Sequence, residues 1–96
     1  MVYMITYDLN NPGQNYEKLI EAIKKASNGI WCSFWKSSFL IQSNFITADE
    51  VLKKIKDYLD SNDRLIVIEV TNNYQGWLAD EEWNYINDTI FDSPIF

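Results

Sequence analysis

The ionisable side chains of this 96-residue chain exclude several kinds of catalytic site. The chain contains no histidine and a single cysteine, Cys32. A Ser-His or Cys-His nucleophile requires an imidazole base, and a structural zinc site requires several Cys or His ligands, so both are excluded. A single cysteine also cannot form a disulfide within the chain. The side chains left to carry chemistry are carboxylates and aromatic rings.

The acidic residues are unevenly distributed along the chain. Residues 1–64 contain eight acidic and all eight basic residues, whereas residues 65–96 contain six acidic residues and no Lys or Arg. The last third therefore carries the whole net charge of −6. A protein that binds a nucleic-acid duplex usually neutralises the phosphates with a basic patch, so nucleic-acid binding is doubtful here.

Residues 77–96 form an acidic and aromatic C-terminal extension that has two interpretations. It is a solvated tail helix whose aromatic residues dock on the chain's own sheet or on a second copy. Alternatively, it imitates the charge of a nucleic acid and binds a basic host protein, as a phage-encoded inhibitor of a bacterial defence system would. The residues predicted to bind a protein partner are Trp77, Asp80, Glu81, Glu82, Trp83 and Asp88.

Hydrophobic periodicity predicts the elements that position these side chains. Alternating apolar residues predict strands at 2–9, 30–34, 38–43 and 64–71. Apolar residues at helical spacing predict a helix at 15–27. Thr47 and Glu50 have the spacing of a capping box that begins a second helix, and Asp80 is predicted to cap a short last helix.

This order of elements predicts one α+β domain of the ferredoxin-like class, spanning residues 1–96. The β-α-β-β-α-β order with right-handed crossovers gives an antiparallel four-stranded sheet in the order 4-1-3-2, with both helices on one face and a short C-terminal helix added. No apolar run approaches the roughly 20 residues of a transmembrane helix. The opening strand also lacks a basic leader, so we expect a cytoplasmic protein with no membrane partner.

The apolar pattern also predicts which side chains point away from the helices. Two uniformly apolar strand faces should lie under the helices, namely Tyr3, Ile5, Tyr7 and Leu9, and Ile66, Ile68 and Val70. Asp8 and Glu69 then lie on the opposite, open face of the sheet. That face also carries Met4, Leu65 and Val67, which makes it too apolar to remain in water. We expect the last helix or a second copy of the chain to cover it.

Short segments of the sequence resemble a known group of proteins. The segments are Tyr7-Asp8-Leu9-Asn10, Pro12-Gly13, Asn62-Asp63-Arg64-Leu65 and Gly76-Trp77-Leu78. Together they are similar to short bacterial and phage proteins called SinR-like. Those proteins are placed near VapD toxins and the small ferredoxin-like nuclease subunit of CRISPR adaptation, and the resemblance in topology covers most of residues 2–78.

The resemblance implies a symmetric homodimer with packed sheets and a function linked to defence or mobile elements. In the nuclease members, an aspartate from each subunit holds Mg²⁺ between the subunits, and Asp8 is the residue that matches. It would be the metal ligand and catalytic residue of a Mg²⁺-dependent endonuclease. Other interpretations stay open: an Asx hydrogen bond from Asp8 to the following turn, an ion pair with Arg64, and a purely structural dimer.

Overall fold

The computed structural model describes residues 1–10 and 16–92 and has the predicted order of elements. The elements are β1 Val2–Asp8, α1 Tyr16–Ala26, β2 Ile30–Trp35, β3 Ser38–Gln42, α2 Ala48–Ile55, β4 Arg64–Glu69 and α3 Asp80–Tyr85. A 3₁₀ turn, Lys56–Tyr58, follows α2, and a π-helical turn, Ile86–Ile90, extends α3. The α+β class and the C-terminal helix are therefore confirmed. The predicted turn residues Pro12 and Gly13 lie outside the described residues.

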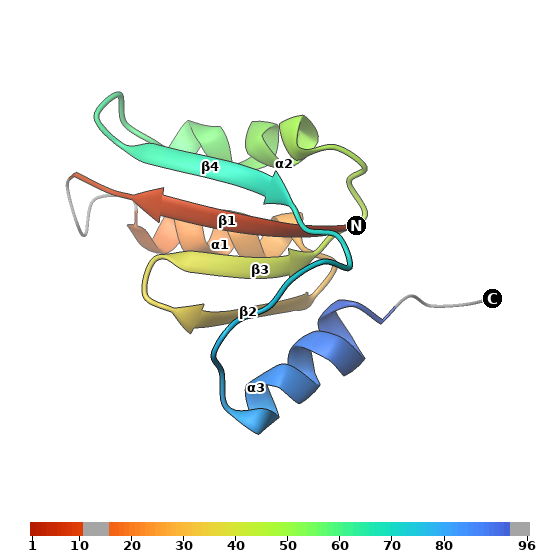
Figure 1. Cartoon of the computed structure of the whole chain (residues 1–96). Coiled ribbons are helices and arrows are strands. Elements are labelled where there is room, and N and C mark those ends of the chain that lie inside the picture. The colour runs from red at the N-terminus through yellow and green to blue at the C-terminus, as the bar shows by residue number, and fades with distance from the viewer. Residues whose placement is uncertain (11–15, 93–96) are drawn as a thin grey trace.

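The four strands form one antiparallel sheet with α1 and α2 packed on one face (Figure 1). The strand order is β2-β3-β1-β4, which is the predicted 4-1-3-2 read from the other edge. The central strand β1 pairs with β3 on one side and β4 on the other. No helix of the described residues has the length and apolarity required to cross a membrane.

The main core lies between the sheet and the two helices. Apolar residues recur at three- and four-residue intervals in α1, so Leu19, Ala22, Ile23 and Ala26 are buried on one stripe. The predicted start of α2 is confirmed, because the Thr47 hydroxyl accepts a hydrogen bond from the Glu50 backbone N–H at 3.2 Å. The helical layer therefore covers one face of the sheet, through the core residues that it shares with the strands.

The prediction for the two faces of β4 was wrong. In the ladder with β1, Leu65 and Val67 stand opposite buried residues of β1, and directly opposed residues share a face. Both therefore pack into the main core, whereas Ile66 and Ile68 lie on the open face and are 54% and 47% exposed. Glu69 lies on the helix side, at the exposed end of the strand. Both faces of β4 are apolar in sequence, so only the register with β1 could decide between them.

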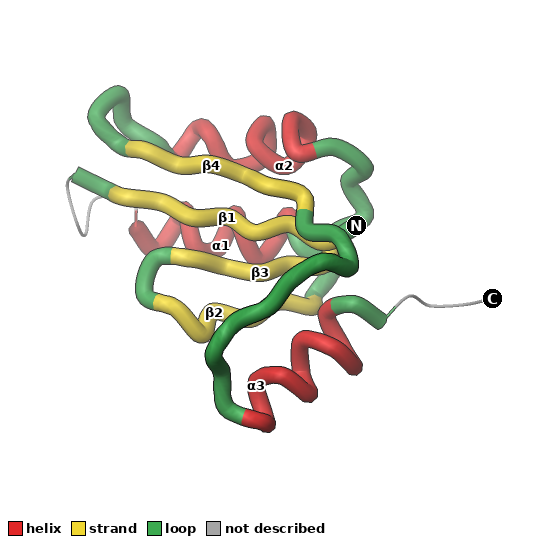
Figure 2. The backbone as a smooth tube through the Cα atoms, viewed as in Figure 1, coloured by secondary structure: helices red, strands yellow, loops and turns green. Residues whose placement is uncertain are grey.

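The chain after β4 covers part of the open face. We call residues 70–92 the C-terminal segment; it runs across the sheet from β4 toward β2 and forms α3 there (Figure 1, Figure 2). A second core fills the space between this segment and the sheet, with the buried residues Val2, Cys32, Leu40, Ile86 and Ile90. The prediction that the last helix covers the open face is thus confirmed for the β2–β3 half, while the exposed Ile66 and Ile68 of β4 remain outside this cover.

Candidate functional site

A buried amide holds the end of the C-terminal segment on the sheet. Gln42 of β3 is only 7% exposed, and its Nε2 donates hydrogen bonds to the carbonyl oxygens of Ile90 and Asp92 at 3.0 and 2.9 Å. Its Oε1 accepts a hydrogen bond from Asn28 Nδ2 at 2.7 Å, which sets the orientation of the amide. Carbonyl groups at a helix end have no hydrogen-bond donor within the helix, so Gln42 supplies the donors that the segment itself lacks.

One further hydrogen bond joins α3 to the sheet, and another caps the start of this helix. The Tyr85 hydroxyl donates to the backbone carbonyl oxygen of Trp31 at 3.1 Å. At the start of α3, the Glu82 carboxylate accepts from the Ala79 backbone N–H at 2.9 Å. Asp80 was predicted to be the cap of this helix, and that prediction is wrong, because Ala79 is the capping residue and Asp80 is the first residue of α3.

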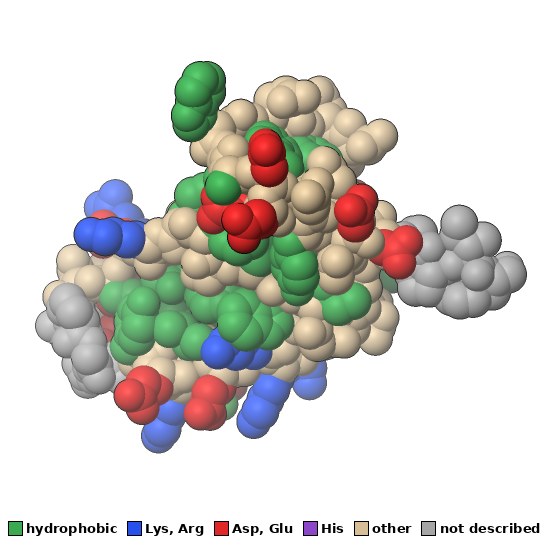
Figure 3. Space-filling model, turned by 90° about the horizontal axis from the view of Figure 1, so that it is seen from below, with side chains coloured by type: hydrophobic (Ala, Val, Ile, Leu, Met, Phe, Trp, Pro, Cys, Tyr) green, Lys and Arg blue, Asp and Glu red, His purple; other side chains and the backbone are tan. Residues whose placement is uncertain are grey.

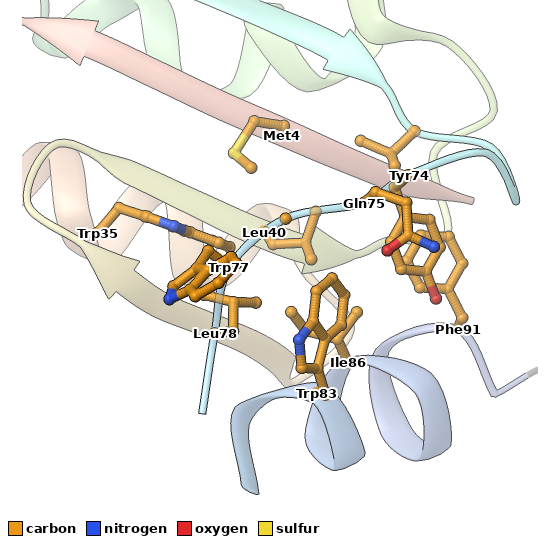
Figure 4. Close-up of a pocket in the computed structure, with 12 residues that line it drawn as sticks. Met4, Trp35, Leu40, Tyr74, Gln75, Trp77, Leu78, Trp83, Ile86 and Phe91 are labelled. Carbon is orange, nitrogen blue, oxygen red and sulfur yellow. The ribbon is translucent and has the colours of Figure 1, made fainter. Parts of the chain in front are cut away.

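An apolar cavity of about 240 Å³ lies between the C-terminal segment and the sheet (Figure 4). Its lining is mostly aliphatic and aromatic and includes Met4, Trp35, Leu40, Tyr74, Leu78, Trp83, Ile86 and Phe91. The ring of Tyr74 stacks on Phe91 with 4.6 Å between the centroids, and on Trp83 with 6.2 Å. The cavity is therefore walled by stacked rings from a segment that is itself tied to the sheet.

Trp77 borders this cavity and projects into solvent. Its side chain is 99% exposed, the largest exposed fraction among the large apolar side chains of the described residues. A tryptophan buried in an interface contributes a large apolar area, and tryptophans are enriched among the residues that dominate binding energy. Because the fold does not bury the indole, its whole apolar surface is available for burial against a partner.

Exposed acidic residues follow this indole along the C-terminal segment. Asp80 and Glu81 are exposed three and four residues after Trp77, Asp88 is exposed further along, and Glu82 is half-buried in its capping role. Figure 3 shows acidic side chains gathered over the C-terminal segment, with apolar surface beside them. The residues predicted to bind a protein thus lie on one segment, where Trp77, Asp80, Glu81 and Asp88 are exposed and Trp83 contributes to the cavity wall.

Asp8 lies elsewhere, on the open face at the end of β1, as predicted. It is exposed and borders a shallow hollow of about 280 Å³ together with Thr6, Arg64 and Ile66. Asp8 stands opposite Arg64 in the ladder, but the two side chains do not form an ion pair; within the described residues the ion pair found is Lys53–Asp49. The alternative of an Asp8–Arg64 pair is therefore wrong.

Metal binding at Asp8 would require help from outside the chain. Within residues 1–10 and 16–92, no three carboxylate or thiol side chains come together in a group that could hold a metal ion. Mg²⁺ can be held by one or two protein carboxylates with waters, so Asp8 could serve only together with a second molecule or a substrate phosphate. A shared metal site at Asp8 therefore stays a prediction.

The single thiol is not a functional candidate. Cys32 is buried in the second core, and burial, with a smaller effect of the nearby Glu82 charge, raises the pKa of the thiol to about 11. The reactive form of cysteine is the thiolate, so Cys32 is protonated and unreactive at neutral pH.

Several lining residues of the cavity were missed by sequence reasoning. Tyr74 and Leu78 lie in the irregular part of the C-terminal segment, where no period marks a buried side. Met4 was predicted to lie on the covered open face, as it does, whereas nothing local indicated that Trp35 would face the same segment. No protein-family model matches this chain, and no curated protein matches it significantly.

Proposed function

We propose that this protein is a cytoplasmic protein-binding module that binds a basic partner protein through its C-terminal segment. The observation that carries the proposal is Trp77, which is 99% exposed, borders an apolar cavity and precedes the acidic first turn of α3 by three residues. An apolar anchor beside uniform negative charge suits a partner surface that combines a pocket or apolar side chain with Lys and Arg residues.

The scaffold supports this role because it presents the segment in one fixed arrangement. The β-α-β-β-α-β order fits a ferredoxin-like fold, which we propose for residues 1–69. The second core and the Gln42 hydrogen bonds hold the segment on that platform. A surface that is already ordered loses less conformational entropy on binding, which favours affinity.

The charge of the segment indicates the class of partner. The segment has five acidic and no basic residues, which would attract a positively charged groove and repel nucleic acid. Grooves of this kind occur in proteins that bind nucleic acids. A partner from a nucleic-acid-based defence system, inhibited by occupation of its groove, matches these requirements.

The experiment is affinity capture from a nuclease-treated bacterial lysate, followed by titration of the purified captured protein. Trp77→Ala and the double variant Asp80→Asn/Glu81→Gln should each weaken binding at least about 10-fold. The matched controls are Tyr58→Ala, an exposed aromatic residue of the helical layer, and Glu17→Gln/Asp57→Asn, exposed acids of the same layer. A captured protein that binds these two test variants as well as the wild type, or that does not compete with duplex DNA, would overturn the proposal.

A Mg²⁺-dependent endonuclease is a second candidate, because Asp8 is exposed on the open face beside Arg64, a side chain that can contact phosphate. In this hypothesis Asp8 of each copy in a homodimer is both metal ligand and catalytic residue. Incubation with single-stranded and duplex RNA and DNA, in MgCl₂ and in EDTA, tests it. Cleavage lost in Asp8→Ala but retained in Asp57→Ala, an exposed aspartate of the helical layer, supports the nuclease, and cleavage that persists in Asp8→Ala removes it.

A further inference from the structure

The two edges of the sheet differ in how far they are protected. At the β2 edge, the ladder with β3 is irregular between Cys32 and Trp35, and the Tyr85 hydroxyl occupies the Trp31 carbonyl oxygen. At the other edge, β4 pairs with β1 without interruption, and within the described residues no strand lies beyond it (Figure 1). A bulge and a covering helix are devices that prevent strand addition, and β4 has neither.

The register determines which backbone groups of β4 point outward. The Val70 N–H donates to the Val2 carbonyl oxygen at 2.8 Å, so residues 64, 66, 68 and 70 form the hydrogen-bonded pairs with β1. The N–H and C=O groups of Leu65, Val67 and Glu69 therefore point away from the sheet. No hydrogen bond among the described residues uses them.

Exposed apolar side chains lie along the same edge. Ile66 and Ile68 of β4 are 54% and 47% exposed on the open face. They belong to a strand of six residues whose outward N–H and C=O groups are free. The C-terminal segment does not cover them, since its core involves β2, β3 and the start of β1. An edge that is apolar, regular and uncharged in its centre is suited to pairing with another strand.

We propose that a second copy of this chain occupies the edge, with the two β4 strands paired antiparallel about a two-fold axis at Val67. In this register Ile66 lies opposite Ile68 of the partner subunit, and Leu65 lies opposite Glu69 of the partner subunit. The outward backbone groups then form about six hydrogen bonds across the axis. Four isoleucine side chains gather into one apolar cluster on the open face.

Two physical constraints exclude several neighbouring registers. In a continuous sheet, directly opposed residues lie on the same face. The two-fold axis must therefore pass through a residue and not between two residues, which excludes a register that pairs Arg64 with Glu69 of the partner subunit. An axis at Ile66 would place Glu69 opposite Asp63 of the partner subunit, and like charges directly opposite each other are destabilising. An axis at Val67 avoids this repulsion and joins isoleucine to isoleucine.

The dimer has two consequences for the rest of the molecule. A two-fold axis perpendicular to the sheet places both C-terminal segments on one side, so a single assembly presents two acidic surfaces and can bind bivalently. The two Asp8 side chains lie about 25 Å apart, given the spacing of strands and residues, which is too far to share one cation. This edge-to-edge dimer therefore differs from a dimer of packed sheets, and it does not depend on the proposed function.

Disulfide trapping tests the register directly. Ile66→Cys and Ile68→Cys are made separately in a Cys32→Ala background, distinguished by mass, mixed and oxidised. Non-hydrogen-bonded pairs bring Cβ atoms about 4.5–5.5 Å apart, close to disulfide geometry. The expected result is a mixed 66–68 disulfide dimer, at least about five-fold more abundant than either homodimer. A dominant 66–66 or 68–68 product, or equal trapping by a Ser33→Cys control on the β2 edge, overturns the proposal.

Sedimentation gives a second measurement that needs no cysteine. The wild-type chain should dimerise at or below roughly 100 µM, as expected for a small interface. Ile68→Lys should weaken dimerisation at least about 10-fold because it places a charge in the apolar cluster, whereas Phe34→Lys on the other edge should not. A wild-type chain that is strictly monomeric at that concentration contradicts the proposal, whatever the outcome of partner binding.

Discussion

At the scale of single residues, Gln42 shows how one side chain ties two distant parts of the chain together. It lies in β3, yet it donates to carbonyl oxygens of Ile90 and Asp92 almost 50 positions later. The amide can do this only in one orientation, which the hydrogen bond from Asn28 selects. The docking of the acidic surface therefore depends on a residue outside that surface.

Gln42→Glu is expected to destabilise the protein by about 2–4 kcal/mol. The substitution removes the donor and places a buried carboxylate against carbonyl oxygens. Urea unfolding measures the loss, and the tryptophan emission of the segment should shift to longer wavelength. Gln75→Glu, the same change at an exposed position, should alter stability by less than about 0.5 kcal/mol. Equal effects of the two changes would refute the role given to Gln42.

The buried thiol leads to a prediction about pH. The pKa of Cys32 is about 11 in the folded chain, whereas an unfolded cysteine has a pKa of about 8.5. The unfolded chain therefore loses its proton first as the pH rises. The contribution of the protonated, buried thiol to the free energy of unfolding is therefore complete below about pH 8.5, and it is lost as the pH rises through about 11.

Cys32→Ala should consequently lose less stability than the wild type between about pH 8.5 and 11. Urea unfolding at several pH values compares the two proteins. Tyr3 and Tyr7, whose pKa values are also raised by burial, are present in both, so the difference isolates the thiol. Parallel pH profiles would show that Cys32 does not titrate differently on unfolding.

At the scale of elements, the faces of β4 determine what each residue of the strand does. Val67 should be sensitive to charge because it packs into the main core, and Ile68 should tolerate charge because it is exposed. Val67→Asp is expected to cost at least about 3 kcal/mol, and Ile68→Asp less than about 1 kcal/mol. Thermal unfolding in dilute solution, where the chain is monomeric, measures both, and the reverse order would restore the original assignment of the faces.

At the scale of the whole molecule, charge differs between the two faces of the sheet. Residues 1–64 have no net charge, and five of the six acidic residues of the last third lie in the C-terminal segment, on the side of the sheet opposite α1 and α2. Binding of a basic partner should therefore weaken as salt rises, with association slowed about 10-fold or more. Stopped-flow mixing measures the rate. Asp80→Asn/Glu81→Gln should reduce the salt dependence, and Glu17→Gln/Asp57→Asn should leave it unchanged.

Local patterns in the sequence were sufficient for the elements. The period of apolar residues predicted the strands and helices in order, and the Thr47 cap predicted where α2 begins, because these features depend on residues close together in the chain. The fold class follows from that order. The six acidic and aromatic residues proposed for partner binding were also visible in the sequence, because residue types can be read without knowing how the strands pair.

Tertiary structure alone decided the faces of β4 and the docking of the C-terminal segment. Each depends on partners far away in the chain: β1 sets the face of β4, Gln42 of β3 holds residues 90 and 92, and the irregular residues 70–79 acquire a buried side only against the sheet. The local spacing of apolar residues shows which face of a strand or helix is apolar. Long-range packing determines which surface of the protein buries that face.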